Sequence, residues 1–182
     1  MSSRKRPNNK TSNYLITMVS NDFDRNSKNI LGKLRSNFMG TEFQLYNSGR
    51  SPKDIQLHES TQKNEDNIKL RSELAVILYA KNVIGSKGPR RMRVCLGNME
   101  EEKEPNDLWQ PAHKDDEMLT CFKHKIQPAI NDLYILQNKI PQWNDQIGAF
   151  VLNFNGRVTK ASVKNFQLTH EMNEEKIILQ VS

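Results

Sequence analysis

The chain has 182 residues, 27 Lys/Arg against 21 Asp/Glu, a formal net charge of +6 and a mean hydropathy of −0.76. This length predicts a single domain, and the low mean hydropathy indicates a polar molecule with long loops. No apolar run approaches the length of a membrane span, and the N-terminal sequence MSSRKRPNNK has no apolar stretch after its charges, so we expect neither a spanning helix nor a secretory leader.

Eight short runs rich in β-branched and aromatic residues are typical of strands, because polar or Gly/Pro turns separate them. These runs are residues 13–19, 42–47, 73–80, 91–96, 133–138, 149–155, 162–169 and 176–182. Asn155 and Gly156 suit positive φ and predict a hairpin between the sixth and seventh runs. Residues 115–126 are the best helix candidate, because acids open the segment, lysines lie near its end and Pro128 follows it. We therefore expect an all-β barrel or sandwich with one short surface helix.

In the sequence GKLRSNFMGTEFQLY, residues 32–46, one residue separates Lys33 from Arg35. Side chains at positions i and i+2 of an extended chain share a face, so these two cations stand together, with Leu34 opposite. Like charges side by side repel unless an anion lies between them, so the spacing favours an anionic ligand. The alternative is a solvated strand face without a ligand, and these residues alone leave it open.

Charge is unevenly spread along the chain. Residues 1–50 carry nine Lys/Arg against three Asp/Glu, residues 81–93 carry five cations and no acid, and residues 100–117 carry eight acids and two bases. This distribution predicts basic faces that attract phosphates or lipid headgroups. Within residues 84–92, the sequence IGSKGPRRM fits either a loop that holds phosphate through backbone amides or a turn followed by exposed bases.

Residues for catalysis are not arranged in a recognisable pattern. The four histidines lie mostly in polar contexts without an acid and a nucleophile at motif spacing, and the sequence contains no Walker-type loop or dinucleotide fingerprint. Cys95 and Cys121 lie far apart without metal-ligand spacing, which fits reduced thiols in an intracellular protein. We therefore expect no enzymatic activity, no catalytic residue, no cofactor, no metal site and no disulfide.

Five segments of the chain resemble the tubby-like family. They are KTSNYLI (10–16), GKLRSNFMGTEF (32–43), LRSELAVILYAKNVIGSKGPRRM (70–92), LQNKIPQWN (136–144) and FVLNFNGRVTKASVKNFQL (150–168), and their order and spacing also match. The resemblance covers nearly all of residues 10–180, and NFNGRVTKASVKNFQ is its most specific motif. It implies a β-barrel of antiparallel strands whose lumen is filled by an apolar helix.

The resemblance also implies recognition of phosphoinositides, chiefly phosphatidylinositol 4,5-bisphosphate, at the plasma membrane. In the family the headgroup is held by the two cations of GKLRSN, the arginine of LRxELA and the asparagine of SNYLI. Those positions are here Lys33, Arg35, Arg71 and Asn13. A phosphate between Lys33 and Arg35 would offset their repulsion, and Arg71 would offer a planar fork to a second phosphate. Auxiliary cations expected to face an anionic membrane are Arg4, Lys5, Arg6 and Lys87.

Compared with the family pattern, the strands before KTSNYLI and the apolar helix that fills the barrel are missing. We therefore expect a partial tubby-like domain over residues 10–182 that is marginally stable, self-associates or needs a protein partner to complete the barrel. Residues 1–9 are expected to form a disordered basic tail, and residues 49–69 and 97–114 long polar loops.

Two other functions remain open at this point. The N-terminal RKRP and a pI near 9.3 also fit a nuclear nucleic-acid-binding regulator of transcription, although neither a recognition-helix module nor an aromatic platform accompanies them. The chain also fits a truncated isoform without function. The phosphoinositide hypothesis predicts a cytoplasmic protein peripheral at the plasma membrane, with the cilium or nucleus as further locations and a role in membrane or ciliary trafficking or signalling.

Overall fold

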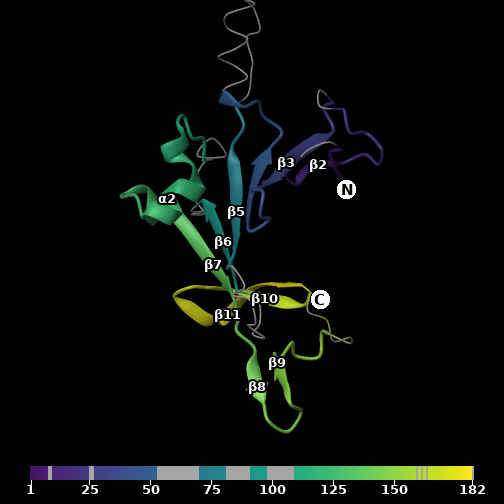
Figure 1. The fold of residues 1–182 in the computed structure, drawn as a ribbon, viewed down its shortest axis with the longest axis vertical. Coiled ribbons are helices and arrows are strands. Elements are labelled where there is room, and N and C mark those ends of the chain that lie inside the picture. The colour runs from purple at the N-terminus through teal and green to yellow at the C-terminus, as the bar shows by residue number, and fades with distance from the viewer. Residues whose placement is uncertain are drawn as a thin grey trace, which may run out of the picture. The chain divides into compact units, whose positions relative to one another are not determined.

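The computed structural model describes residues 1–7, 10–24, 27–52, 70–80, 91–97, 109–158, 160, 162 and 164–181. In this part of the chain, regular structure is mostly strand (Figure 1). The strands are β1 (Ser2–Lys5), β2 (Asn13–Thr17), β3 (Ile30–Ser36), β4 (Glu42–Asn47), β5 (Glu73–Tyr79), β6 (Met92–Gly97), β7 (Leu133–Asn138), β8 (Gln142–Asn144), β9 (Ala149–Val151), β10 (Phe166–His170) and β11 (Asn173–Val181). The helical elements are η1 (Lys114–Asp116), α2 (Met118–His124) and η2 (Ala129–Asp132).

Nine strands form one sheet in the order β1-β2-β3-β4-β5-β6-β7-β10-β11, and β8 and β9 form a second. The pairs β1–β2, β2–β3, β3–β4, β7–β10, β10–β11 and β8–β9 are antiparallel. The all-β prediction is therefore confirmed. No helix among the described residues is both long enough and apolar enough to cross a bilayer.

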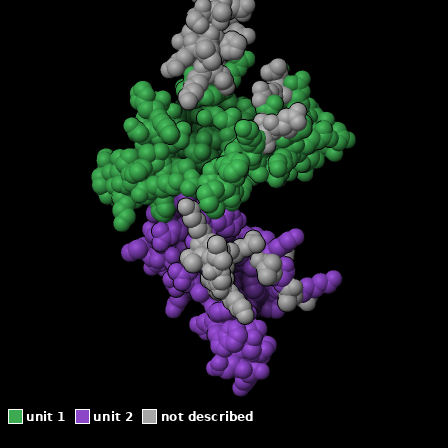
Figure 2. Space-filling model, in the orientation of Figure 1, with its two compact units in different colours: residues 1–77, 95–134 green, residues 78–94, 135–182 purple. Residues whose placement is uncertain are grey.

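The chain divides into two compact units, residues 1–77 with 95–134 and residues 78–94 with 135–182 (Figure 2). In the first unit, β1 to β4 pair in chain order as a meander. Alternation along β2 and β4 buries Leu15 and Tyr46, and α2 buries Met118 and Cys121, three residues apart on one helix face. This meander carries most of the predicted site.

The second unit contains the strand β10, which pairs with both β7 and β11. Gln167, Leu168 and Thr169 are all buried in β10, so this strand is covered on both faces. In the smaller sheet, the rings of Trp143 and Phe150 are cross-strand neighbours that meet edge to face with 5.2 Å between centroids.

The predicted helix over residues 115–126 is wrong in extent, because η1 and α2 divide it. Glu117, between them, is extended with φ −63° and ψ 138°. The backbone N–H of Met118 donates to the carboxylate of Glu73 at 2.6 Å, so a tertiary partner satisfies this amide at the start of α2. The extended Glu117 therefore separates η1 from α2, and α2 begins as an element of its own.

The predicted hairpin at Asn155 and Gly156 is also wrong in its pairing. Both residues have positive φ, 51° and 74°, as predicted. However, β9 pairs back with β8, and β10 pairs with β7 and β11. The Asn155–Gly156 turn therefore joins strands that belong to different sheets.

Two strands outside the eight predicted runs contribute to the meander. Residues 2–5, assigned to the tail by the sequence, form β1, which needs only backbone hydrogen bonds to β2 to hold its place at the edge. β3 was recognised only through its cation spacing, since Gly32, Lys33 and Arg35 interrupt its apolar pattern. The expected loops at 49–69 and 97–114 lie largely outside the described residues.

Candidate functional site

Three of the four predicted headgroup residues lie on one face of the meander. Directly opposed residues of an antiparallel pair project to the same face of the sheet. Asn13 of β2 lies opposite Arg35 of β3, and Lys33 of β3 lies opposite Tyr46 of β4. Since Lys33 and Arg35 are two residues apart on β3, these two opposed pairs project to the same face of the sheet. The extended K-x-R arrangement is therefore confirmed.

The aromatic ring of Tyr46 is the centre on which the two arginines converge. The guanidinium carbon of Arg71 lies 4.2 Å from the ring centroid, and that of Arg35 lies 5.9 Å from it. Tyr46 is only 3% exposed, so its ring is held by packing. A planar cation that lies over a fixed ring is restricted in its orientation.

Arg71 is held by close backbone contacts before β5 begins. Its N–H donates to the carbonyl of Arg50 at 2.9 Å, and a Cβ added to Gly49 would lie 2.4 Å from the backbone of Arg71. The side chain of Asn47 accepts the N–H of Ser72 at 2.9 Å, and the N–H of Asn47 donates to the Ser72 carbonyl at 3.1 Å. The end of β4 and the start of β5 are thereby fixed together, which brings Arg71 to Tyr46.

The buried carboxyl group of Glu73 is a hydrogen-bond partner of the Tyr46 side chain. Glu73 accepts hydrogen bonds from the Met118 N–H at 2.6 Å and from Gln44 Nε2 at 3.2 Å, and the Tyr46 side chain also hydrogen-bonds to it. Burial raises the pKa of Glu73, and the nearby Glu117 raises it further. Burial and the Glu73 charge also raise the pKa of Tyr46, so its hydroxyl keeps its proton and donates.

The auxiliary cations divide between the two faces. Arg4 lies opposite Leu15, which in turn lies opposite Lys33, so Arg4 shares the face of Lys33. The guanidinium carbon of Arg4 lies 4.3 Å from the centroid of the Phe23 ring. The N–H of Arg6 donates to the carbonyl of Asn13 at 2.8 Å, so Arg6 lies beside Asn13, which in turn lies opposite Arg35. Lys5 lies opposite Tyr14 and therefore on the other face. Lys87 lies outside the described residues.

This arrangement presents an ammonium group, guanidinium groups and a side-chain amide on one face, and it has the chemistry of an anion site. The described residues contain no group of three or more His, Cys, Asp or Glu side chains placed to hold a metal ion. Cys95 and Cys121 are both buried, and neither is part of a disulfide.

Sequence reasoning missed the residues that organise this face, namely Tyr46, Gln44, Asn47, Gly49 and Glu73. Alternation along EFQLYN places Gln44 and Tyr46 on a common face and was available as a signal. Which arginines contact the ring of Tyr46 depends on the register between neighbouring strands, and the alternation of residues within one strand does not specify that register.

Comparisons with known proteins agree with this architecture. A sequence profile of the Tub family matches residues 1–182. Tubby-related protein 2 of Mus musculus is 42% identical over 180 residues, which cover 99% of this chain and 30% of that protein. Tubby-related protein 1 of Homo sapiens is 41% identical over 180 residues, with 99% and 31% covered, and Tubby protein homolog 1 of Caenorhabditis elegans is 37% identical over 181 residues, with 99% and 40% covered. The chain thus spans well under half the length of these relatives, and its large antiparallel sheet is consistent with the tubby β-barrel fold.

Proposed function

Because the chain belongs to the Tub family, we propose that it is a phosphoinositide-binding module that recognises phosphatidylinositol 4,5-bisphosphate at the plasma membrane. The observation that carries this proposal is the convergence of Arg35 and Arg71 on the ring of Tyr46, with Lys33 and Asn13 on the same face of β2 and β3. Such a constellation meets the needs of a doubly phosphorylated ring, namely several donors and fixed positive charge.

Each residue has a distinct role in the proposed complex. Lys33 and Arg35 share one phosphate, which offsets the repulsion between neighbouring cations on β3. Arg71 presents its guanidinium fork to the second phosphate, and Asn13 donates through its amide without adding charge. Charge-assisted hydrogen bonds contribute roughly 1.5–3 kcal/mol each, so three cations support affinity on the order of micromolar after desolvation costs.

The proposal is tested by co-sedimentation with vesicles that contain phosphatidylinositol 4,5-bisphosphate, phosphatidylinositol 4-phosphate or phosphatidylserine. We expect selective binding to the bisphosphate vesicles, and a loss of about 10-fold or more in Lys33→Ala/Arg35→Ala and in Arg71→Ala. The matched control is Lys164→Ala/Lys176→Ala, which removes two exposed cations from the second unit. Equal binding to all acidic vesicles, unchanged by the site substitutions, would contradict the proposal.

The same proteins distinguish the nucleic-acid alternative. Binding to duplex DNA through phosphates weakens steeply with salt and without selectivity for sequence, because it depends on counterion release. Headgroup recognition instead separates bisphosphates from singly phosphorylated lipids at one salt concentration. A location at the cytoplasmic face of the plasma membrane and a role in membrane or ciliary trafficking follow from the proposed binding, and they fail with it.

A further inference from the structure

Phe38 and Met39 form the tip of the β3–β4 hairpin, and both are highly exposed for apolar side chains. Phe38 is 79% exposed and Met39 is 63% exposed. Single exposed apolar residues are common on protein surfaces, but two large adjacent ones at a hairpin tip depart from the polar composition that turns usually have. Their hydration is a free-energy cost that an apolar environment would remove.

Hydrogen bonds within the turn hold this tip in shape. Asn37 Oδ1 accepts the N–H of Thr41 at 2.9 Å and that of Glu42 at 3.3 Å, and Asn37 Nδ2 donates to Thr41 Oγ1 at 2.9 Å. The N–H of Gly40, whose φ is +66°, donates to the carbonyl of Asn37 at 3.2 Å. Much of the polar backbone of the turn is thus satisfied internally, which lowers the cost of moving it out of water.

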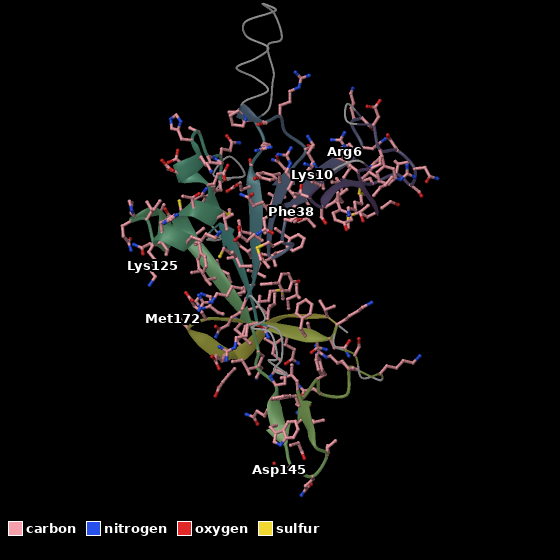
Figure 3. The ribbon with its side chains drawn as sticks, viewed as in Figure 1. Arg6, Lys10, Phe38, Lys125, Asp145 and Met172 are labelled. Carbon is pink, nitrogen blue, oxygen red and sulfur yellow. The ribbon has the colours of Figure 1, made fainter. Side chains whose placement is uncertain are left out.

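The tip lies at the end of the meander that carries the basic face. The N–H of Ser36 donates to the Ser12 carbonyl at 2.8 Å, and the N–H of Ser12 donates to Ser36 Oγ at 3.1 Å, which ties the turn to the residue before Asn13. Figure 3 labels Arg6, Lys10 and Phe38 in this same part of the first unit.

The charge around the tip complements an anionic surface. Residues 1–13 and 33–43 together carry six Lys/Arg and one acid. Of these cations, Arg4, Arg6, Lys33 and Arg35 lie on the face of Asn13. That acid, Glu42, forms an ion pair with Lys123 at 2.7 Å. Cations around an exposed apolar pair fit a bilayer, where anionic headgroups lie directly above hydrocarbon. An acidic protein groove fits the charge as well, but it does not account for two large apolar side chains exposed at the tip.

We propose that Phe38 and Met39 insert into the interfacial layer of an anionic bilayer while the basic face holds the headgroups. This inference rests on the proposed function and adds a second, non-polar contact to it. The headgroup residues supply selectivity, and the tip supplies affinity for lipid in a bilayer that a soluble headgroup cannot provide.

The test compares Phe38→Ser/Met39→Ser with the native chain on two probes, bisphosphate vesicles and soluble inositol 1,4,5-trisphosphate. We expect vesicle binding to weaken about 10-fold or more, because partial burial of two large apolar side chains is lost, and trisphosphate binding to stay within about 2-fold. The matched control is Ile147→Ser/Met172→Ser, which removes two apolar side chains that are 66% and 84% exposed in the second unit. This control is expected to bind both probes as the native chain does.

A direct measurement of depth uses Phe38→Trp and vesicles whose acyl chains carry bromine. Insertion predicts stronger quenching of this variant than of the native chain, whose Trp109 and Trp143 supply the background. Undiminished vesicle binding by the serine variant, an equal loss on both probes, an equal loss in the control variant, or unchanged quenching would each overturn the inference. If the native chain binds all acidic vesicles without selectivity and the tip variant still weakens that binding, the proposed headgroup function fails while the inserted tip stands.

Discussion

Tyr46 gives the sharpest prediction, because its ring contacts both arginines of the proposed site. Replacing Tyr46 with Leu keeps an apolar side chain in the core and removes the aromatic surface. The contact of Arg71 at 4.2 Å lies well within the range of a cation–π interaction, while that of Arg35 at 5.9 Å lies at its limit. A cation–π contact contributes about 0.5–1 kcal/mol when exposed and about 2 when desolvated, and it orients the arginines before a ligand binds. Losing that orientation should weaken headgroup binding by at most about 1–2 kcal/mol, or roughly 5- to 30-fold.

The assay is calorimetric titration of the folded variant with inositol 1,4,5-trisphosphate, with Tyr46→Phe as the matched control. The phenylalanine variant keeps the ring but loses the hydroxyl that hydrogen-bonds to Glu73. Its affinity should stay near that of the native chain, while its stability falls by about 1–3 kcal/mol because a buried carboxylate loses a donor. For a chain of this size, that is about 2–4 °C in Tm for each kcal/mol.

Two results would refute this reasoning. A folded Tyr46→Leu variant with native affinity would show that the arginines do not need the ring. Equal losses of affinity in the leucine and phenylalanine variants would place the effect in the hydroxyl and Glu73. The two variants therefore separate an aromatic surface that orients cations from a hydrogen bond that holds the fold.

Three further predictions concern backbone approach, buried charge and an unpaired hydroxyl. Gly49→Ala should destabilise by about 1–3 kcal/mol and weaken headgroup binding, because the new Cβ would meet the Arg71 backbone at 2.4 Å; Gly148→Ala, with nothing within 4 Å, should leave binding unchanged despite its strained φ of +64°. Glu73→Gln should flatten the dependence of Tm on pH, because burial raises the folded-state pKa of Glu73. The native chain should therefore lose stability relative to the variant as the pH rises above 4.5, the ordinary pKa of a glutamate. Equal changes of Tm with pH in the two proteins would contradict this. Thr169→Val should be neutral or raise the stability by about 1 kcal/mol, because the buried Thr169 Oγ1 has no hydrogen-bond partner among the described residues, and a clear loss in thermal unfolding would show that it has one.

The strands that sequence predicted best are those whose composition and neighbours agree. The predicted runs 42–47 and 133–138 match β4 and β7 at both ends, since polar residues flank compact apolar segments. The N-terminal edge strand β1 was missed because its place depends on β2 as a partner and not on its own four residues, SSRK. Edge strands of this kind carry little information in their side chains.

The candidate site was predictable only in part, and for a physical reason. The spacing of Lys33 and Arg35 predicted their shared face, because alternation is a property of one strand. Tyr46 and Glu73 could not be placed, because their contacts depend on the register of β4 against β3 and on the backbone approach of Gly49 to Arg71. Contacts between segments distant in sequence carry no periodic signal.

The geometry also shows which contacts offset the repulsion between neighbouring cations on this face. Lys33 and Arg35 on one strand repel each other, and Arg71 adds a third charge at the same ring. The face of Tyr46 offers electron density to both guanidinium groups, and its hydroxyl donates a hydrogen bond to the carboxyl of Glu73. These contacts reduce the repulsion between the neighbouring cations. In the proposed complex, an anion close to Lys33, Arg35 and Arg71 removes the remaining repulsion, so relief of like-charge repulsion within the protein contributes to the expected free energy of headgroup binding.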